Sequence, residues 1–143
     1  MKIVLIGPGC MPIPAPGWGA VERIIWDYYQ VLNGKNNISI SNNNKNDNVS
    51  SSIDIGINHN VYIINTPNYN EIIEQCNKLN PDVAHIMYDD HILVARELKA
   101  PIILYTSHFA YLTHPELSKT YSGYFYNIFM KVIQQADNNR LWL

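Results

Sequence analysis

Apolar residues along the chain alternate between two periods, one typical of strands and one typical of helices. A continuous aliphatic run at residues 2–6 predicts a buried parallel strand, because a strand covered on both faces shows no polar alternation. From Ala20 onward apolar residues recur at spacings of three and four, which predicts a helix that Gly34 ends in a C′ position. The predicted buried face of this helix consists of Val21, Ile24, Ile25, Tyr28, Val31 and Leu32.

The alternation resumes after about residue 60 and continues to the last residues of the sequence. Helical spacing predicts helices over about 69–79, over 90–98 and over about 118–136. The second of these is expected to begin with Asp89 or Asp90 as its N-cap. Strands are predicted over 61–66, 82–87 and 101–106, and RLWL at 140–143 has the pattern of a strand start.

This order of strands and helices predicts an α/β fold with a doubly wound, Rossmann-like parallel sheet in a single domain over residues 1–143. Ligands bind such sheets beyond the carboxyl ends of the strands, where the strand order reverses. We therefore expect the functional residues in the strand-end loops at 7–19, 66–68, 88–90 and 107–117.

Residues 33 to about 60 interrupt this pattern with a segment dominated by Asn and Ser. These residue types favour turns and solvated backbone over packed structure. We interpret the segment at about 35–60 as a flexible surface insertion, with a short strand around 38–40.

Composition narrows the classes of partner and compartment. The chain has 143 residues, 47% of them apolar, and a formal charge of −2 without a long basic run, which argues against binding to nucleic acid. No stretch reaches the roughly 18 apolar residues of a membrane span, so we expect a cytoplasmic or membrane-peripheral protein with no transmembrane segment. Cys10 and Cys76 are far apart in sequence and suggest neither a disulfide framework nor a metal site.

The loop that leads into the first helix is the strongest candidate for a binding site. Its backbone is restricted, and the helix N-terminus that follows offers unpaired N–H groups and a dipole that favour a phosphate or diphosphate. Gly17 and Gly19 allow a ligand to approach the backbone closely. A loop that merely turns the chain is an equally good interpretation on chemistry alone. The restricting residues are Pro12, Pro14, Pro16, Gly17 and Gly19, with Trp18 between the glycines.

Established nucleotide-binding fingerprints do not fit this loop. A dinucleotide fingerprint that starts at Gly7 would need glycine where Pro12 stands, and the loop is about ten residues long, which exceeds that tight turn. A P-loop would need Gly-Lys-Ser/Thr, whereas Gly19 precedes Ala20 and Val21.

Three segments in order resemble the amino-terminal domain of glycosyltransferase family 4, which comprises retaining nucleotide-sugar enzymes of GT-B architecture. They are the strand and loop that end in GWGAVER, PDVAHIMYDDH at 81–91, and PIILYTSH at 101–108. The similarity covers nearly the whole chain except the Asn-rich segment. It implies a hexosyl transfer with a nucleotide sugar as co-substrate, a sugar, lipid or protein acceptor, and no metal or other cofactor.

The resemblance assigns the donor's diphosphate to the mouth of the first helix. The segment Gly19-Ala20-Val21-Glu22 matches the turn whose backbone amides face the diphosphate in the family, and Gly17 before it is expected to bind the donor as well. Ala20 replaces the usual second glycine, and its methyl group leaves the diphosphate less room to approach the backbone amides. Glu22 is expected to favour the helix dipole and to orient the loop rather than to take part in the chemistry.

His108 matches the family histidine near the transferred sugar, where the imidazole is expected to bond a sugar hydroxyl or the developing charge; a strand-end cap through a backbone contact is the alternative. His85 lies in the middle of an apolar run and is interpreted as a packed core histidine. The candidates for contacts with the acceptor are Tyr88, Asp89, Asp90, Tyr111 and His114, although an N-cap role explains either aspartate equally well.

The family's second domain holds most of the nucleotide sugar with two glutamates eight residues apart, and no two glutamates of this sequence have that separation. The resemblance therefore implies an acceptor-side domain that is a poor catalyst without a separate donor-binding domain. A non-catalytic Rossmann-like module that binds a phosphorylated ligand or a protein partner is the main alternative. A nicotinamide-dependent oxidoreductase is a weaker one, because no Asp or Glu closes the strand at 61–66.

Overall fold

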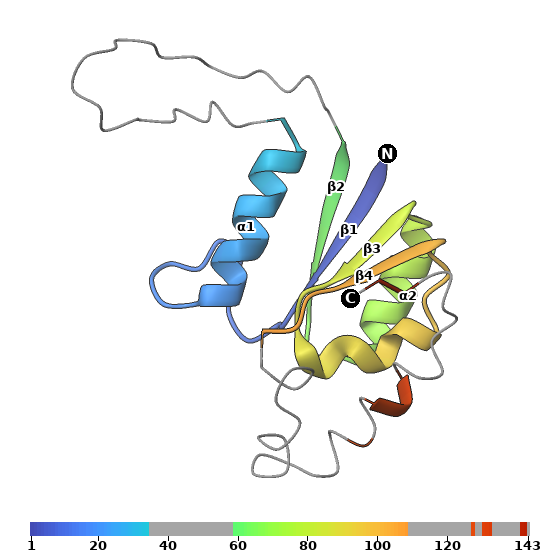
Figure 1. Cartoon of the computed structure of the whole chain (residues 1–143). Coiled ribbons are helices and arrows are strands. Elements are labelled where there is room, and N and C mark those ends of the chain that lie inside the picture. The colour runs from blue at the N-terminus through green and yellow to red at the C-terminus, as the bar shows by residue number, and fades with distance from the viewer. Residues whose placement is uncertain (35–58, 109–126, 128–129, 133–140, 143) are drawn as a thin grey trace, which may run out of the picture.

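A five-stranded parallel sheet forms the centre of the computed structural model, which describes residues 1–34, 59–108, 127, 130–132 and 141–142 (Figure 1). All four neighbouring strand pairs are parallel, so the predicted α/β class with a parallel sheet is confirmed. The strand order is β2-β1-β3-β4-β5. The strands are β1 (Lys2–Gly7), β2 (Asn60–Asn65), β3 (Val83–Ile86), β4 (Ile102–Tyr105) and β5 (Leu141–Trp142).

Three helical elements lie between these strands, close to the predicted positions. They are α1 (Ala20–Leu32), α2 (Tyr69–Leu79) and η1 (Asp89–Arg96), and η1 is a 3₁₀ helix rather than the α-helix that the spacing suggests. Residues 127 and 130–132 are helical, as predicted, and the rest of the helix expected over 118–136 lies outside the described residues. The Asn-rich segment lies outside them as well, apart from residues 59–60.

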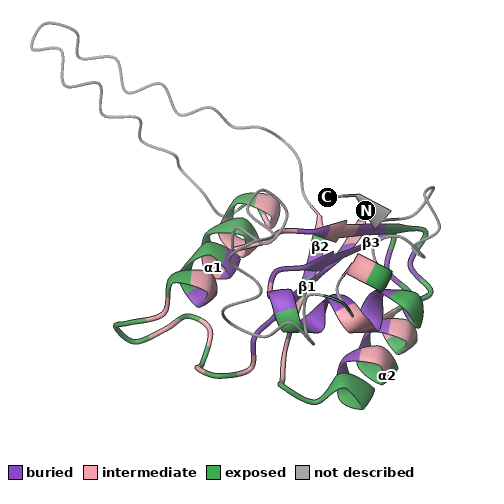
Figure 2. Cartoon of the chain, turned by 60° about the horizontal axis from the view of Figure 1, so that its bottom comes forward, coloured by how far each residue is buried: buried purple, intermediate pink, exposed green. Residues whose placement is uncertain are grey.

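Alternate residues of β1 enter two separate apolar clusters, one on each face of the sheet. Val4 and Ile6 pack with side chains of α2 and η1. Ile3 and Leu5 pack with side chains of α1. Figure 2 shows α1 and α2 on opposite sides of the buried strands. The continuous apolar run of β1 is thus explained by burial on both faces, which is typical of parallel sheets.

The predicted apolar face of α1 is only partly correct. Ile25 is fully buried against the sheet, but Ile24, Tyr28 and Val31 are 37%, 44% and 41% exposed. The six predicted residues span a wider arc than the sheet covers, and the buried part of that arc is centred on Ile25. Part of the apolar face of α1 therefore stays exposed.

The strand order places a reversal at β1. The chain passes from β1 to β2 on one side of it and later returns to β3 on the other side. Parallel α/β sheets bind ligands beyond the carboxyl ends of the strands at such a point.

Among the described helices, none is both long enough and apolar enough to cross a membrane.

Candidate functional site

Asp89 is a buried carboxylate just beyond the carboxyl end of β3, and only 1% of its surface is exposed. Its Oδ1 accepts hydrogen bonds from the Tyr105 hydroxyl at 2.6 Å and the Ser107 hydroxyl at 2.8 Å. Its Oδ2 accepts one from the backbone N–H of His108 at 3.1 Å. Three donors from the end of β4 thus satisfy a charge that would otherwise be costly to bury.

The prediction that Asp89 or Asp90 is the N-cap of this helix is wrong. The N-cap residue is Tyr88, and no side chain caps the helix. The Asp89 carboxylate instead accepts hydrogen bonds from three donors at and just after the end of β4. Sequence alone could not reveal these donors, because the folded sheet brings them to Asp89. Its part in contacting an acceptor stays a prediction, and both of its oxygens already accept hydrogen bonds.

His85 and His108 lie near each other at this edge. His85 is buried, as predicted for a core histidine, with Nε2 2.8 Å from the Thr106 hydroxyl and its ring edge-on to Tyr28 of α1. Burial, with the nearby His108 charge as a smaller cause, lowers the pKa of His85 to about 4. The Nε2 of His108 is buried and has no hydrogen-bond partner among the described residues.

His91 is a buried polar residue that sequence reasoning missed. Its ring lies edge-on to Tyr69 and Tyr88, with centroids 5.6 and 5.2 Å away, and it donates a hydrogen bond to the Gly7 carbonyl. Burial lowers the pKa of His91, and the Asp90 charge opposes that effect only in part. Tyr88 is a local neighbour, but the spacing of residues 88–91 gives no signal of the contacts with Gly7 of β1 and Tyr69 of α2.

The loop after β1 begins with a fixed segment. Gly9 has φ of +76°, and a Cβ there would lie 2.3 Å from the backbone N of Pro67. The Asn65 side chain accepts a hydrogen bond from the Gly9 N–H at 2.8 Å and donates one to the Met11 carbonyl at 2.7 Å. Only glycine fits this contact between the loops that follow β1 and β2.

Residues 12–18, which we call the outer loop, contrast with that fixed segment. Trp18 is 88% exposed, and a Cβ added at Gly17 would meet no atom within 4 Å. Gly19 is the N-cap of α1 with φ of +143°, and no side chain caps the helix. The buried Glu22 carboxylate lies beneath this turn, with Oε2 3.0 Å from the position of a Cβ on Gly19.

The structure unites only some of the predicted site residues. His108 and Asp89 are joined by a hydrogen bond, and Tyr88 lies beside them at the start of η1. Residues 17–21 belong to the same carboxyl edge but to the mouth of α1, and no hydrogen bond among the described residues links them to His108. Tyr111 and His114 lie outside the described residues.

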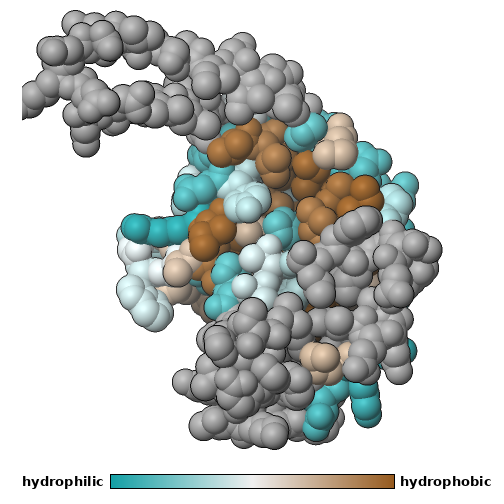
Figure 3. Space-filling model, in the orientation of Figure 1, coloured by the Kyte–Doolittle hydropathy of each residue, from teal (hydrophilic) through white to brown (hydrophobic). Residues whose placement is uncertain are grey.

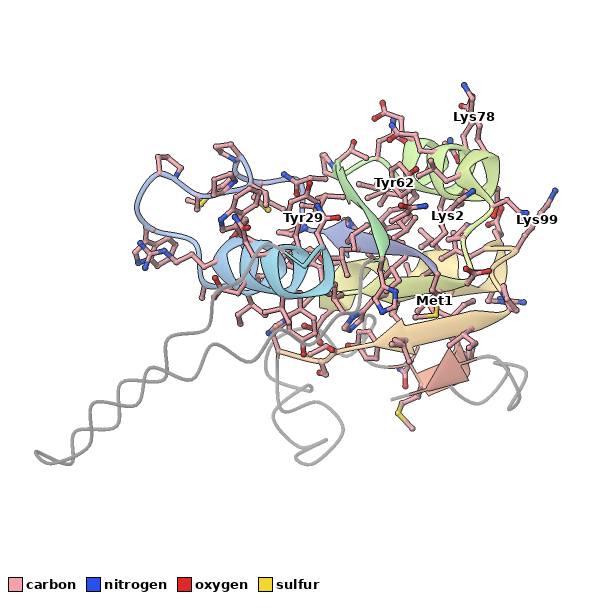
Figure 4. All side chains as sticks on the ribbon, turned by 90° about the horizontal axis from the view of Figure 1, so that it is seen from above. Met1, Lys2, Tyr29, Tyr62, Lys78 and Lys99 are labelled. Atoms are coloured by element: carbon pink, nitrogen blue, oxygen red, sulfur yellow. The ribbon has the colours of Figure 1, made fainter. Side chains whose placement is uncertain are left out.

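Among the residues that the structure describes, few cations lie at this edge. Lys2, Lys78 and Lys99 lie at the opposite, amino edge of the sheet, and Figure 4 shows Lys78 and Lys99 projecting outward there. Arg23, in the first turn of α1, is an exposed cation near the mouth, whereas Asp89 and the exposed Asp90 are acidic. The helix dipole is therefore not reinforced by a described cluster of cations.

Within the described part of the chain, no three His, Cys, Asp or Glu side chains are grouped so that they could hold a metal ion. Cys10 is exposed and Cys76 is buried, and both are free thiols. Comparisons of the chain with protein-family models, with curated proteins and with solved structures find no match.

Proposed function

We propose that this chain forms the acceptor-side wall of a nucleotide-sugar-dependent glycosyl transfer site, as the doubly wound half of a GT-B-type enzyme. The observation that carries the proposal is the buried Nε2 of His108, which has no partner among the described residues and lies beyond the carboxyl end of β4. A buried nitrogen without a partner costs about 1–3 kcal/mol. A sugar hydroxyl that bonds to this nitrogen would remove that cost.

The mouth of α1 supplies the second part of the proposed site. Its first-turn N–H groups have no side-chain cap, and the open space at Gly17 permits a close approach. The amides of residues 19–21 would bond the donor's diphosphate, and His108 would bond the sugar. Tyr88 and Tyr111 are the proposed contacts for the acceptor.

Donor binding by this chain alone is expected to be weak. Arg23 is the described cation nearest the mouth, and the buried Glu22 carboxylate beneath it opposes an anion. Stabilising a departing diphosphate requires donors on both sides of a closed, dry cleft. We propose that a second, donor-binding domain, in cis or in trans, completes that cleft.

NMR titration of the ¹⁵N-labelled chain with UDP-glucose and GDP-mannose tests this function. We expect millimolar affinity, with shifts at the amides of 19–21 and at the His108 imidazole. His108→Ala should lose the sugar-dependent part of the response, and His59→Ala, at the amino end of β2, should keep it. Shifts confined to other regions, or submicromolar binding by the chain alone, would refute the proposal.

A non-catalytic partner-binding module is the second candidate, and the exposed apolar side of α1 favours it. Ile24, Tyr28 and Val31 lie on that side, and Figure 3 shows apolar surface on the face that carries α1. Sedimentation of the chain without any nucleotide sugar discriminates the two functions. Association that is independent of donor, and abolished by Ile24→Glu, would favour the module.

A further inference from the structure

We propose that Asp89 is a positioning residue, which fixes the backbone at His108 so that the imidazole is held in place at the sugar side of the site. The inference rests on the function proposed above for His108. The evidence is that one carboxylate joins η1 to the loop after β4 through three hydrogen bonds. In this proposal Asp89 acts by positioning His108 and does not contact the acceptor.

The two carboxylate oxygens of Asp89 bind different parts of the chain. Oδ1 binds the hydroxyls of Tyr105 and Ser107, which anchors the end of β4. Oδ2 binds the backbone N–H of His108, so the contact constrains the main chain and not the ring. The ring nitrogen Nε2 is buried without a partner among the described residues, as are Nδ1 of His59 and Nδ1 of His91, and a sugar hydroxyl is the partner proposed for it.

A carboxylate suits this position better than its neutral isostere. Asn has one acceptor oxygen, which can serve the two hydroxyls, while its NH₂ group would face the His108 N–H as a second donor. Asp89→Asn therefore keeps the volume of a fully buried side chain and removes the one bond that reaches His108. Ser107→Ala is the matched control, because it removes a donor to Oδ1 and leaves the bond at Oδ2.

Amide hydrogen exchange measured by NMR on the full chain tests the proposal. In Asp89→Asn we expect the His108 amide to exchange at least tenfold faster relative to the Val4 amide of β1, with a shift of the His108 imidazole signals. In Ser107→Ala the ratio of His108 to Val4 exchange should stay within twofold of the wild type. A purely structural role would accelerate both amides by the same factor in both variants, and that result would overturn the proposal.

The wild-type chain gives a second measurement in case Asp89→Asn does not fold. Its His108 amide should exchange at least tenfold slower than the amide of Gly17 in the outer loop, after correction for intrinsic rates. Equal protection at the two positions would overturn the proposal. These exchange measurements use the chain without any sugar. A missing response to UDP-glucose in the separate titration would therefore count against the proposed function and not against the positioning of His108 by Asp89.

Discussion

On the histidine side of the candidate site, residues 85–91 and 105–108 are tied together by buried and partly buried hydrogen bonds. The outer loop at residues 12–18 is largely exposed, apart from Ile13, which packs against the apolar cluster under α1. Asp89 alone holds three donors, and His85 pairs with Thr106. The outer loop is stiffened by its own prolines and contains the most exposed large apolar residue of the described chain, Trp18. The histidine side is ordered by tertiary hydrogen bonds, whereas the outer loop relies on its prolines and on the packing of Ile13.

This difference indicates where each side can adapt to a ligand. Groups on the histidine side are preorganised, so a bound sugar would meet them without further loss of conformational entropy. The outer loop has open space at Gly17, and in the proposed site its prolines would reduce the conformational entropy lost when a ligand orders it. The fixed segment around Gly9 ties the start of the loop after β1 to the end of β2.

The largest effect is expected where the fixed segment begins. Gly9→Ala places a methyl group 2.3 Å from Pro67 N at φ of +76°, so we expect a loss of about 4 kcal/mol in the free energy of unfolding. Gly17→Ala is the matched control in the outer loop, with an expected change within about 0.5 kcal/mol. Urea denaturation measures both, and equal losses would show that the two segments do not differ.

Acid should weaken the histidine side. The folded chain lowers the pKa of His85 from 6.5 to about 4, so between these values the unfolded chain binds a proton that the folded chain does not. Stability is therefore full above pH 6.5 and falls by about 3 kcal/mol as the pH decreases to 4. Chemical denaturation at a series of pH values from 7 to 4 measures the free energy of unfolding. This free energy should fall less steeply with decreasing pH in His85→Gln than in the wild type. An unchanged dependence of stability on pH in His85→Gln would contradict the burial argument.

A smaller effect is expected at the connection to β2. Asn65→Ala removes the hydrogen bonds to Gly9 and Met11 and should cost about 2 kcal/mol of stability. Asn65→Asp keeps the acceptor for Gly9 and should lose about half as much. Thermal unfolding at neutral pH compares both Asn65 variants with Asn70→Ala, a control at an exposed position. If Asn65→Ala lost as little stability as this control, contacts other than those of Asn65 would fix the loop.

The smallest effect is expected at the tip of the outer loop. Trp18→Ala should change the free energy of unfolding by less than about 0.5 kcal/mol, because the side chain is 88% exposed. Trp26→Ala is the contrasting variant, since Trp26 is half-buried and stacks on Tyr29 with centroids 5.2 Å apart. Calorimetry of both variants checks the order, and a larger loss at Trp18 would mean that the outer loop packs against the domain.

Much of the fold follows from local patterns in the sequence. The aliphatic run of β1, the three- and four-residue spacing before Gly34 and the strand–helix alternation predicted the parallel sheet and the bounds of α1 and α2 to within a few residues. These features depend on period and on turn residues, which are properties of neighbouring positions. The expectation that functional residues lie in the strand-end loops rests on the same alternation and stays a prediction.

The tertiary structure alone decided which polar groups meet. Asp89 carried a plausible local role as an N-cap, yet its partners at 105–108 come from another strand. The buried contacts of His91 and the packing of Gly9 against Pro67 likewise join segments far apart in sequence. Sequence periodicity indicates which face a residue occupies, but hydrogen-bond partners are set by strand order and register, which arise only when the sheet assembles.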